Sequence, residues 1–160
     1  MAGDVYAASG SRIYIGPSST SATDTAAEFA ALVWTEIGLV EDIGEFGDAS
    51  NVISGAVIGD ARVRKAKGAA DAGDWTITVF DDPTDVGQVA LVAAQATKSN
   101  YAFKVVSPNR LAAPGQDGIE YFRGMVMGKR KRMGGNDNLV RRVFTVGINS
   151  PIVEVAPTAS

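Results

Sequence analysis

Residues 74–80 read Asp-Trp-Thr-Ile-Thr-Val-Phe and alternate polar and apolar side chains more cleanly than any other stretch of the chain. In an extended strand Trp75, Ile77 and Val79 would point to one side and the two threonines to the other. Aromatic and β-branched residues also favour strands. The pattern therefore predicts a half-buried β-strand whose apolar side faces a core.

Strand-type patterns occur on both sides of this stretch, at residues 11–16, 33–37, 61–67, 101–106, 119–133 and 139–148. Gly134–Asn138 separates the last two segments, and glycine and asparagine tolerate the positive φ angles of a hairpin turn. Gly68 and Gly73 predict a second tight turn, which would join 61–67 to 74–80. The tail, residues 151–160, would add one edge strand or hang free.

One substantial helix is expected directly after the central strand. Asp82 suits its N-cap and Pro83 its first position, and the helix would run to about Thr97. An apolar stripe is expected to face the core: Val86, Val89, Ala90, Ala93 and Ala96. Leu91 lies on the opposite side of the helix, so we expect it to contact another subunit.

A shorter helix is expected upstream, where Thr25-Ala26-Ala27-Glu28 forms a capping-box pattern. The β-favouring residues 33–37 would end it early. With many strands and one substantial helix, the sequence predicts a mainly β fold. We expect antiparallel sheets in a sandwich or barrel core, flanked by that one α-helix.

The stretch between residues 38 and 60 is acidic and punctuated by glycine, and it predicts a long extended hairpin with a mobile tip. Residues 1–61 hold nine acidic residues and one basic residue, whereas residues 62–160 hold nine acidic and fourteen basic ones. Folding could mix the two halves, in which case the asymmetry has no consequence. The other interpretation is a protein with faces of opposite charge, which suits head-to-tail binding of identical copies.

Composition excludes several classes of site. The 160 residues include no cysteine and no histidine, which removes disulfides, thiolate catalysis and the commonest general base and metal ligand. We expect no cofactor. Met1–Asp4 lacks the features of a signal peptide, and the longest apolar stretch, Val86–Ala96, is too short to span a bilayer. We expect one domain over residues 1–160, with a core at about 11–150.

Three charged segments admit a chemical interpretation beside a structural one. Asp81–Asp85 could bind a hard cation, but helix capping explains every one of these residues without a metal. Lys129–Arg132 could contact nucleic-acid phosphates, yet its side chains would alternate between two faces and no aromatic residues are interleaved to stack bases. Residues 36–48 could supply paired carboxylates, but they lack an apolar frame that would raise one pKa. We therefore expect capping, a solvated or subunit-pairing hairpin, and no catalysis.

Five pieces between residues 60 and 150 resemble, in order, the lambda-type tail tube proteins (major tail proteins) of siphophages. They are Lys67-Gly68…Ala72-Gly73-Asp74 with Thr76–Val79, Pro83…Gly87–Leu91, Tyr101–Lys104 with Pro108-Asn109, Phe122–Val126, and Arg142–Val146. The resemblance implies a structural protein and not an enzyme. It implies hexameric rings that stack into a hollow conduit for DNA, in the virion, after synthesis in the host cytoplasm.

The resemblance also implies partners. These are further copies of the chain, the tape measure, tail tip and terminator proteins, and passing DNA that is not specifically bound; no membrane is implied. The long loop, about residues 38–60, would reach the next ring, with candidate stacking residues Glu41, Asp42, Ile43, Glu45, Phe46 and Asp48. Candidate contacts between subunits are Arg62, Arg64, Leu91, Lys129, Arg130, Lys131 and Arg132.

Other functions stay open from the sequence. A tail completion or hub ring protein, or the tube of a gene transfer agent, would have the same fold. A small nucleic-acid-binding β-barrel would use Lys129–Arg132, and a histidine-free hydrolase would depend on Glu41 or Glu45. For a tube, we expect a channel of neutral or acidic character, because each neutralised phosphate would add affinity and slow the DNA.

Overall fold

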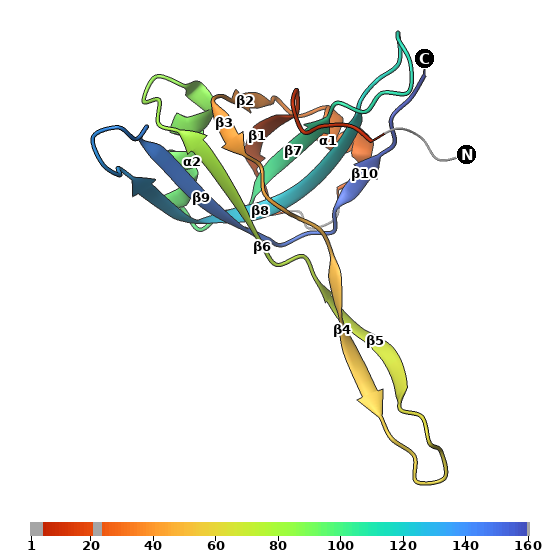
Figure 1. The fold of residues 1–160 in the computed structure, drawn as a ribbon. Coiled ribbons are helices and arrows are strands. Elements are labelled where there is room, and N and C mark those ends of the chain that lie inside the picture. Colours follow the sequence, from red (N-terminus) through yellow and green to blue (C-terminus); the bar gives the residue numbers. More distant parts are fainter. Residues whose placement is uncertain (1–4, 21–23, 160) are drawn as a thin grey trace.

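The computed structural model describes residues 5–20 and 24–159, and their fold is mainly β and antiparallel, as predicted. Seven strands follow one another in the main sheet: β2 (Thr35–Ile37), β1 (Arg12–Ser18), β7 (Tyr101–Ser107), β8 (Gly118–Arg132), β9 (Arg141–Ile148), β6 (Asp74–Phe80) and β3 (Val40–Asp42). A short eighth strand, β10 (Val153–Val155), pairs with the first part of β8. The sheet is strongly twisted (Figure 1), but its two ends, β2 and β3, do not meet over the described residues, so it is not a closed barrel.

The central strand, β6, is formed as predicted. It pairs with β9 from Asp74 opposite Gly147 to Phe80 opposite Arg141. Trp75, Ile77 and Val79 are completely buried, whereas the threonines between them face the other side of the sheet. The apolar residues of β1, β7, β8 and β9 join this face to form the main core.

The helix after β6 covers the core face, but it begins later than predicted and presents the opposite side to the sheet. Helix α2 spans Val86–Gln95, and Asp85, not Asp82, is its N-cap and accepts a hydrogen bond from the Gln88 N–H. Asp82 instead accepts hydrogen bonds from the backbone N–H and the hydroxyl of Thr84, which forms a turn ahead of the helix.

The orientation of α2 follows from two residues that are not hydrophobic. Gly87 crosses β2 so closely that an added Cβ would lie 2.2 Å from the Glu36 carbonyl oxygen. Gln88 is buried, and its side-chain amide donates to the carbonyls of Gly38 and Phe80. Both residues place their side of the helix, which includes Leu91, against the sheet. Four of the five residues of the predicted inward stripe, Val86, Val89, Ala93 and Ala96, therefore face outward, whereas Ala90 packs against the core.

The opposite face of the sheet carries a smaller apolar cluster around helix α1 (Ala26–Ala30). The predicted capping box is present, with Thr25 and Glu28 bonded to each other's backbone N–H groups. Phe29 stacks on Tyr121 of β8 with ring centroids 5.2 Å apart, and the Trp34 indole N–H donates to the Phe29 carbonyl. Residues of α1 and its neighbourhood thus cover β7, β10 and the first half of β8.

A separate two-stranded sheet forms an arm that extends away from this body (Figure 1). Its strands are β4 (Ala49–Gly55) and β5 (Arg64–Asp71). The predicted hairpin therefore exists, but it starts about ten residues later than the expected 38–60 loop. The tight turn predicted between Gly68 and Gly73 is wrong, because Gly68 lies within β5 and the arm reverses direction at residues 56–63.

At the two chain ends, the structure describes the chain from residue 5 and as far as residue 159. The tail adds β10 as a short strand, in agreement with the first of the two expectations for it. Met1–Asp4, for which we expect no signal peptide, lies outside the described residues. None of the described helices combines the length and apolarity needed to cross a membrane.

Candidate assembly surfaces

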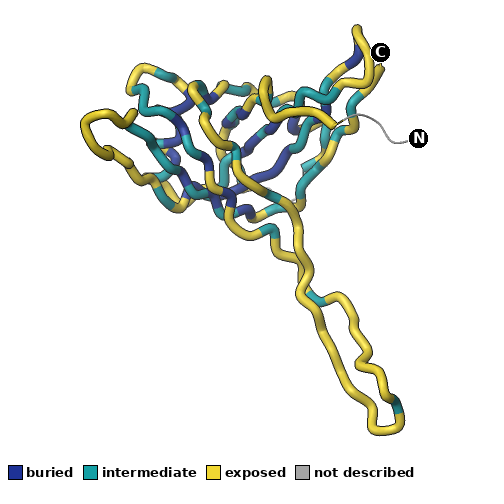
Figure 2. Tube along the Cα trace, viewed as in Figure 1, coloured by how far each residue is buried: buried dark blue, intermediate teal, exposed yellow. Residues whose placement is uncertain are grey.

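The arm is exposed along almost its whole length (Figure 2). Every residue of β4 is exposed, as is every residue of β5 except Gly68. Large apolar side chains nevertheless occur on it: Val52, Ile53, Val57, Ile58 and Val63. Because an isolated two-stranded hairpin is marginally stable in water, exposed apolar residues on such an arm indicate a surface that another molecule covers.

The arm is also cationic near its tip and along β5. Arg62, Arg64, Lys65 and Lys67 all lie there and are exposed. Arg64 forms an exposed ion pair with Asp60, with 3.1 Å between the charged atoms. Within the described residues the other three form no ion pair. The predicted contact residues Arg62 and Arg64 are therefore together at the arm's end, accessible to a partner.

The predicted stacking segment divides into two groups. Phe46 packs its ring against Trp75, with 5.7 Å between centroids, and the Ile43 carbonyl accepts a hydrogen bond from the Trp75 indole. These two residues face the chain's own core and anchor the segment that leads into the arm. The acidic residues point outward, and Glu41 accepts a hydrogen bond from Arg141 of β9.

Three acids of this segment are exposed and form no ion pair with a described residue: Asp42, Glu45 and Asp48. The Asp42 carboxylate accepts a hydrogen bond from the Gly44 N–H, which fixes the turn after β3. This end of the sheet therefore presents uncompensated negative charge.

The basic run on β8 alternates between the two faces of the sheet, and a bulge decides which of its residues take which face. Val126 pairs with Val146, but the register shifts before Gly128, which pairs with Thr145. Beyond the bulge Lys129 lies opposite the core residue Phe144, so the residues at 129 and 131 share the face that carries α2. The residues at 130 and 132 face the other side.

Internal ion pairs engage only part of this run. Lys131 and Arg142 both bind the Asp81 carboxylate, at 3.3 Å and 3.1 Å. Lys129, Arg130 and Arg132 form no ion pair within the described part of the chain. Three of the four basic residues of this run are therefore available to a partner.

The prediction that Leu91 contacts another subunit is wrong, because its side chain is completely buried in the core. The outward face of α2 is apolar instead and carries Val86, Val89, Ala93 and Ala96. A hollow of about 490 Å³ lies beside it, lined by Ala90 and by residues of β1, β7 and the α1–β2 connection. The sequence shows a helix that is apolar on more than one side, a pattern that predicts a second surface packed over it.

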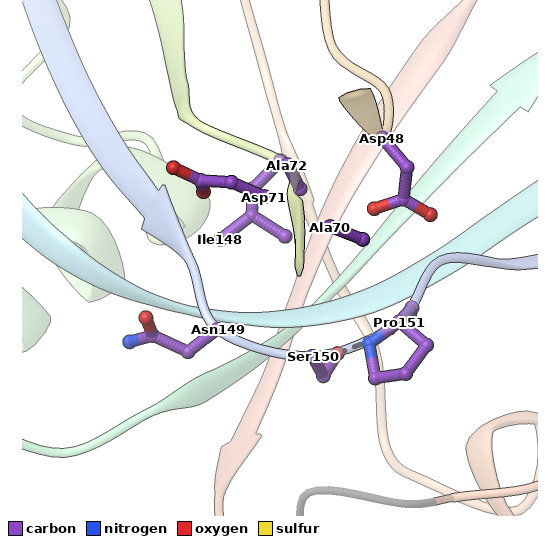
Figure 3. A pocket seen from close by; sticks show the side chains of 8 residues that line it. All are labelled: Asp48, Ala70, Asp71, Ala72, Ile148, Asn149, Ser150 and Pro151. Atoms are coloured by element: carbon purple, nitrogen blue, oxygen red, sulfur yellow. Dashed lines mark hydrogen bonds between the residues drawn. The ribbon is translucent and has the colours of Figure 1, made fainter. Parts of the chain in front are cut away.

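Another hollow, of about 290 Å³, lies where the arm joins the body (Figure 3). Asp48, Asp71 and Ser150 are among its lining residues. The two carboxylates point away from one another in this view, and Asp71 accepts a hydrogen bond from the Gly73 N–H. The hollow therefore has no convergent pair of acids for acid–base chemistry.

The chemical interpretations of the acidic segments find little support in the geometry. The Asp81 carboxylate forms ion pairs with Lys131 and Arg142. Asp82 shapes a turn, and Asp85 caps α2. The hydroxyl and N–H of Thr84 lower the pKa of Asp82, which keeps it charged. Over the described residues, no group of three or more acidic side chains is placed to hold a metal ion.

The exposed apolar residues of the arm were not expected from the sequence. Val52 and Ile53 follow Asn51, and Val57 and Ile58 follow Gly55-Ala56, so each apolar pair stands in polar or small surroundings. These isolated pairs of β-branched residues within a long hairpin are the feature from which the apolar surface of the arm could have been predicted. No pattern in the sequence predicted how the edges of the sheet lie relative to one another.

By sequence, the chain matches no protein-family model and no curated protein. Its fold, however, is shared with solved structures of injection and tail systems. A chain of the anti-feeding prophage (AFP) baseplate, six-fold symmetrised, superposes with a TM-score of 0.71 at 7% identity, covering 98% of each chain. A chain of the PVC sheath/tube terminator in its extended state gives 0.70 at 7% identity, covering 98% of this chain and all of that one.

The SPP1 tail tube protein gives a TM-score of 0.59 at 13% identity, covering 91% of this chain and 76% of that one. At such low identities the likeness concerns the fold. This chain therefore has the fold of tail tube, baseplate and sheath/tube terminator chains.

Proposed function

We propose that this chain is the structural subunit of a long non-contractile tail tube. Copies form hexameric rings, and the rings stack into a hollow conduit that delivers DNA into the host. The observation that carries this proposal is the arm, a free-standing hairpin with exposed apolar and cationic side chains on a body whose fold is that of tube and baseplate chains. Such an arm suits burial against another copy.

The arm provides the axial contact. It extends well beyond the body (Figure 1), and each of its strands is seven or eight residues long, which corresponds to roughly 25 Å at about 3.3 Å per residue. An element of this length reaches a subunit in the next ring. Its apolar residues supply the buried area and its cations supply the orientation.

The face of β6 and β9 opposite the core lines the channel. Thr76, Thr78, Val143 and Thr145 lie on this face, and neither helix packs over them. Hydroxyl groups are compatible with a water-filled channel and do not neutralise phosphates. Arg130 and Arg132 of β8 lie on the same face, opposite Val143 and Arg141 of β9, so this part of the proposed wall is basic, unlike the neutral or acidic channel expected from the sequence.

The remaining parts of the proposal follow from this role. The chain acts without a cofactor and without catalysis, and its partners are its own copies, the tape measure, tail tip and terminator proteins, and passing DNA. It is made in the host cytoplasm and ends in the virion.

Negative-stain electron microscopy of the purified protein over a range of concentrations tests the proposal. We expect hollow rings with six-fold symmetry, or tubes built from them. A variant in which residues 50–70 are replaced by a short glycine–serine linker should keep its circular dichroism signal and form no tubes. Protein that shows neither rings nor tubes at any concentration would contradict the proposal.

One observation favours a second candidate. The baseplate and terminator chains superpose better and over more of their length than the SPP1 tube chain does. A ring protein at one end of a tail is therefore the alternative, and the tube of a gene transfer agent is equivalent in structure. The number of copies per particle distinguishes them, because a tube needs many rings and a completion or hub ring needs one or a few.

A further inference from the structure

The charge of the arm is opposite in sign to that of the whole chain. Residues 49–70 hold four basic residues and one acidic residue, whereas the formal net charge of the 160 residues is −3. The basic residues are Arg62, Arg64, Lys65 and Lys67, and all four are exposed. Such a distribution turns the arm toward an anionic surface and the acidic body away from it.

The one acidic residue of the arm, Asp60, is neutralised within the turn. Its carboxylate lies 3.1 Å from the Arg64 guanidinium and also accepts a hydrogen bond from the Arg62 backbone N–H. The Asp60 N–H in turn donates to the Val57 carbonyl, which closes the turn. The other three cations of the arm form no ion pair within the described residues, so the net charge near the tip is positive.

The turn presents aliphatic side chains to the solvent. Ile58 is fully exposed, and Val57 and Val63 are more than half exposed. No aromatic residue occurs between residues 49 and 70, so a nucleic acid would find cations for its phosphates but no platform for its bases. A lipid headgroup layer accepts both kinds of side chain, because its phosphates attract cations and the acyl chains beneath it accept aliphatic groups.

The spacing of these residues along the arm matches the depth of a headgroup layer. Ile58 lies in the turn, and the first four residues of β5 include Arg64, Lys65 and Lys67. At about 3.3 Å per residue, these three cations extend over roughly 10 Å of strand. Apolar groups of peripheral proteins are buried about 5–10 Å at the boundary between headgroups and acyl chains. With the tip at this depth, the cations are level with the lipid phosphates, and the unpaired backbone edges of the strands stay in water.

The two faces of the arm also differ. Lys67 lies opposite Val52, and Lys65 is two residues away on the same face. The other face carries Ile53 opposite Ala66 and contains neither lysine. The arm is therefore expected to tilt with its lysine face toward an anionic surface once the tip is bound.

We propose that the free arm of an unassembled subunit binds the surface of an anionic lipid bilayer, with the Val57–Ile58 turn in the headgroup layer and the cations of β5 on lipid phosphates. The arm lies in the surface of the bilayer and does not span it. This goes beyond the proposed function, and one part rests on it: in a tube the next ring covers the same residues, so assembly and membrane binding exclude each other. Incorporation into a tube thereby releases a subunit from the membrane.

Sedimentation with lipid vesicles tests the proposal on protein that is dilute enough to be unassembled. We expect binding to phosphatidylcholine vesicles that contain phosphatidylglycerol, no binding to vesicles of phosphatidylcholine alone, and a steep loss of binding as salt is added. Because the tip and the cations both contribute, Ile58→Asp should lower the apparent affinity about tenfold, and so should the double variant Lys65→Glu, Lys67→Glu.

Matched controls lie away from the arm. Leu111→Asp changes another exposed aliphatic residue, and Lys98→Glu changes another exposed lysine. Both should bind the vesicles as the wild type does. If either control loses as much affinity as the arm variants, the arm is not the binding element and the proposal fails.

A fluorescent label measures the depth of the tip, since the chain contains no cysteine of its own. A polarity-sensitive fluorophore on Ile58→Cys should shift its emission to shorter wavelength on anionic vesicles, whereas the same label on Leu111→Cys should not. A label at residue 58 that stays in water while the protein sediments with the vesicles would overturn the insertion of the tip.

The outcomes separate this proposal from the tube. Binding to duplex DNA without binding to vesicles would assign the cations to nucleic acid and overturn the membrane contact. Tubes from a chain that binds no vesicles would have the same effect, and the proposed function would stand. If the arm binds vesicles but the chain forms no hollow assemblies, the proposed function fails and the membrane contact stands. Assembled tubes should bind fewer vesicles per subunit than the free chain does, and equal binding would contradict the mutual exclusion.

Discussion

Arg123 on β8 and Asp24 ahead of α1 form a buried ion pair across 99 positions of sequence, with side chains 4% and 9% exposed. The Arg123 guanidinium also donates to the Pro17 carbonyl and lies over the Phe29 ring. One side chain thus connects the chain before α1, α1 itself and the longest strand.

Removal of this arginine should destabilise the body strongly. Arg123→Met leaves Asp24 buried without its cation, which costs about 3–5 kcal/mol of the free energy of unfolding. The double variant Asp24→Leu, Arg123→Met should lose much less, because no charge stays buried. Urea denaturation measures both, and equal losses in the single and double variants would show that the ion pair is not the cause.

Leu91 and Val89 provide a matched test of the orientation of α2. Leu91→Ala removes a fully buried side chain and should cost about 2–5 kcal/mol of stability. Val89→Ala changes an exposed residue on the same helix and should change stability by less than about 0.5 kcal/mol. Thermal unfolding of the two variants decides this, and a greater loss for Val89→Ala would mean that the helix faces the other way.

The exposed tip of the arm should affect assembly and not folding. Ile58 is fully exposed, so Ile58→Asp should leave the unfolding midpoint unchanged and abolish tubes in negative stain. Leu111→Asp, at another exposed apolar residue away from the arm, is the control and should assemble normally. Tubes of normal length from Ile58→Asp would exclude the tip from the axial contact.

Glu120 should make stability depend on pH. It lies directly opposite Glu154 in the β8–β10 pair, and burial, together with this second carboxylate, raises the pKa of Glu120 above its usual 4.5. The folded protein therefore holds this proton to higher pH than the unfolded chain does. Stability contributed at low pH is consequently lost as pH rises through the interval from 4.5 to the raised pKa.

The variant Glu120→Gln should abolish this loss and unfold at a higher temperature than the wild type at neutral pH. Glu154→Gln should recover part of the difference, because it removes only the second of the two causes. Thermal unfolding at a series of pH values measures the effect, and a wild-type curve that rises over this interval would contradict the assignment.

Short-range patterns in the sequence were sufficient to predict much of the fold. The alternation of residues 74–80 fixed β6 and its buried side, because successive side chains of a strand must point to opposite faces. Thr25 and Glu28 located the start of α1, and the glycine–asparagine run at 134–138 located a hairpin turn, since each depends on backbone geometry within a few residues.

The tertiary structure alone decided the features that depend on distant partners. A helix that is apolar on every side has no preferred face, so the inward side of α2 was set by the crossing of Gly87 over β2 and by the bonds of Gln88. The bulge before Gly128 decided which residues of the basic run share the core face, and the pairing limits of β8 and β3 left two edges unpaired among the described strands. Strand partners and registers are chosen by contacts between residues far apart in sequence, and no local pattern contains that information.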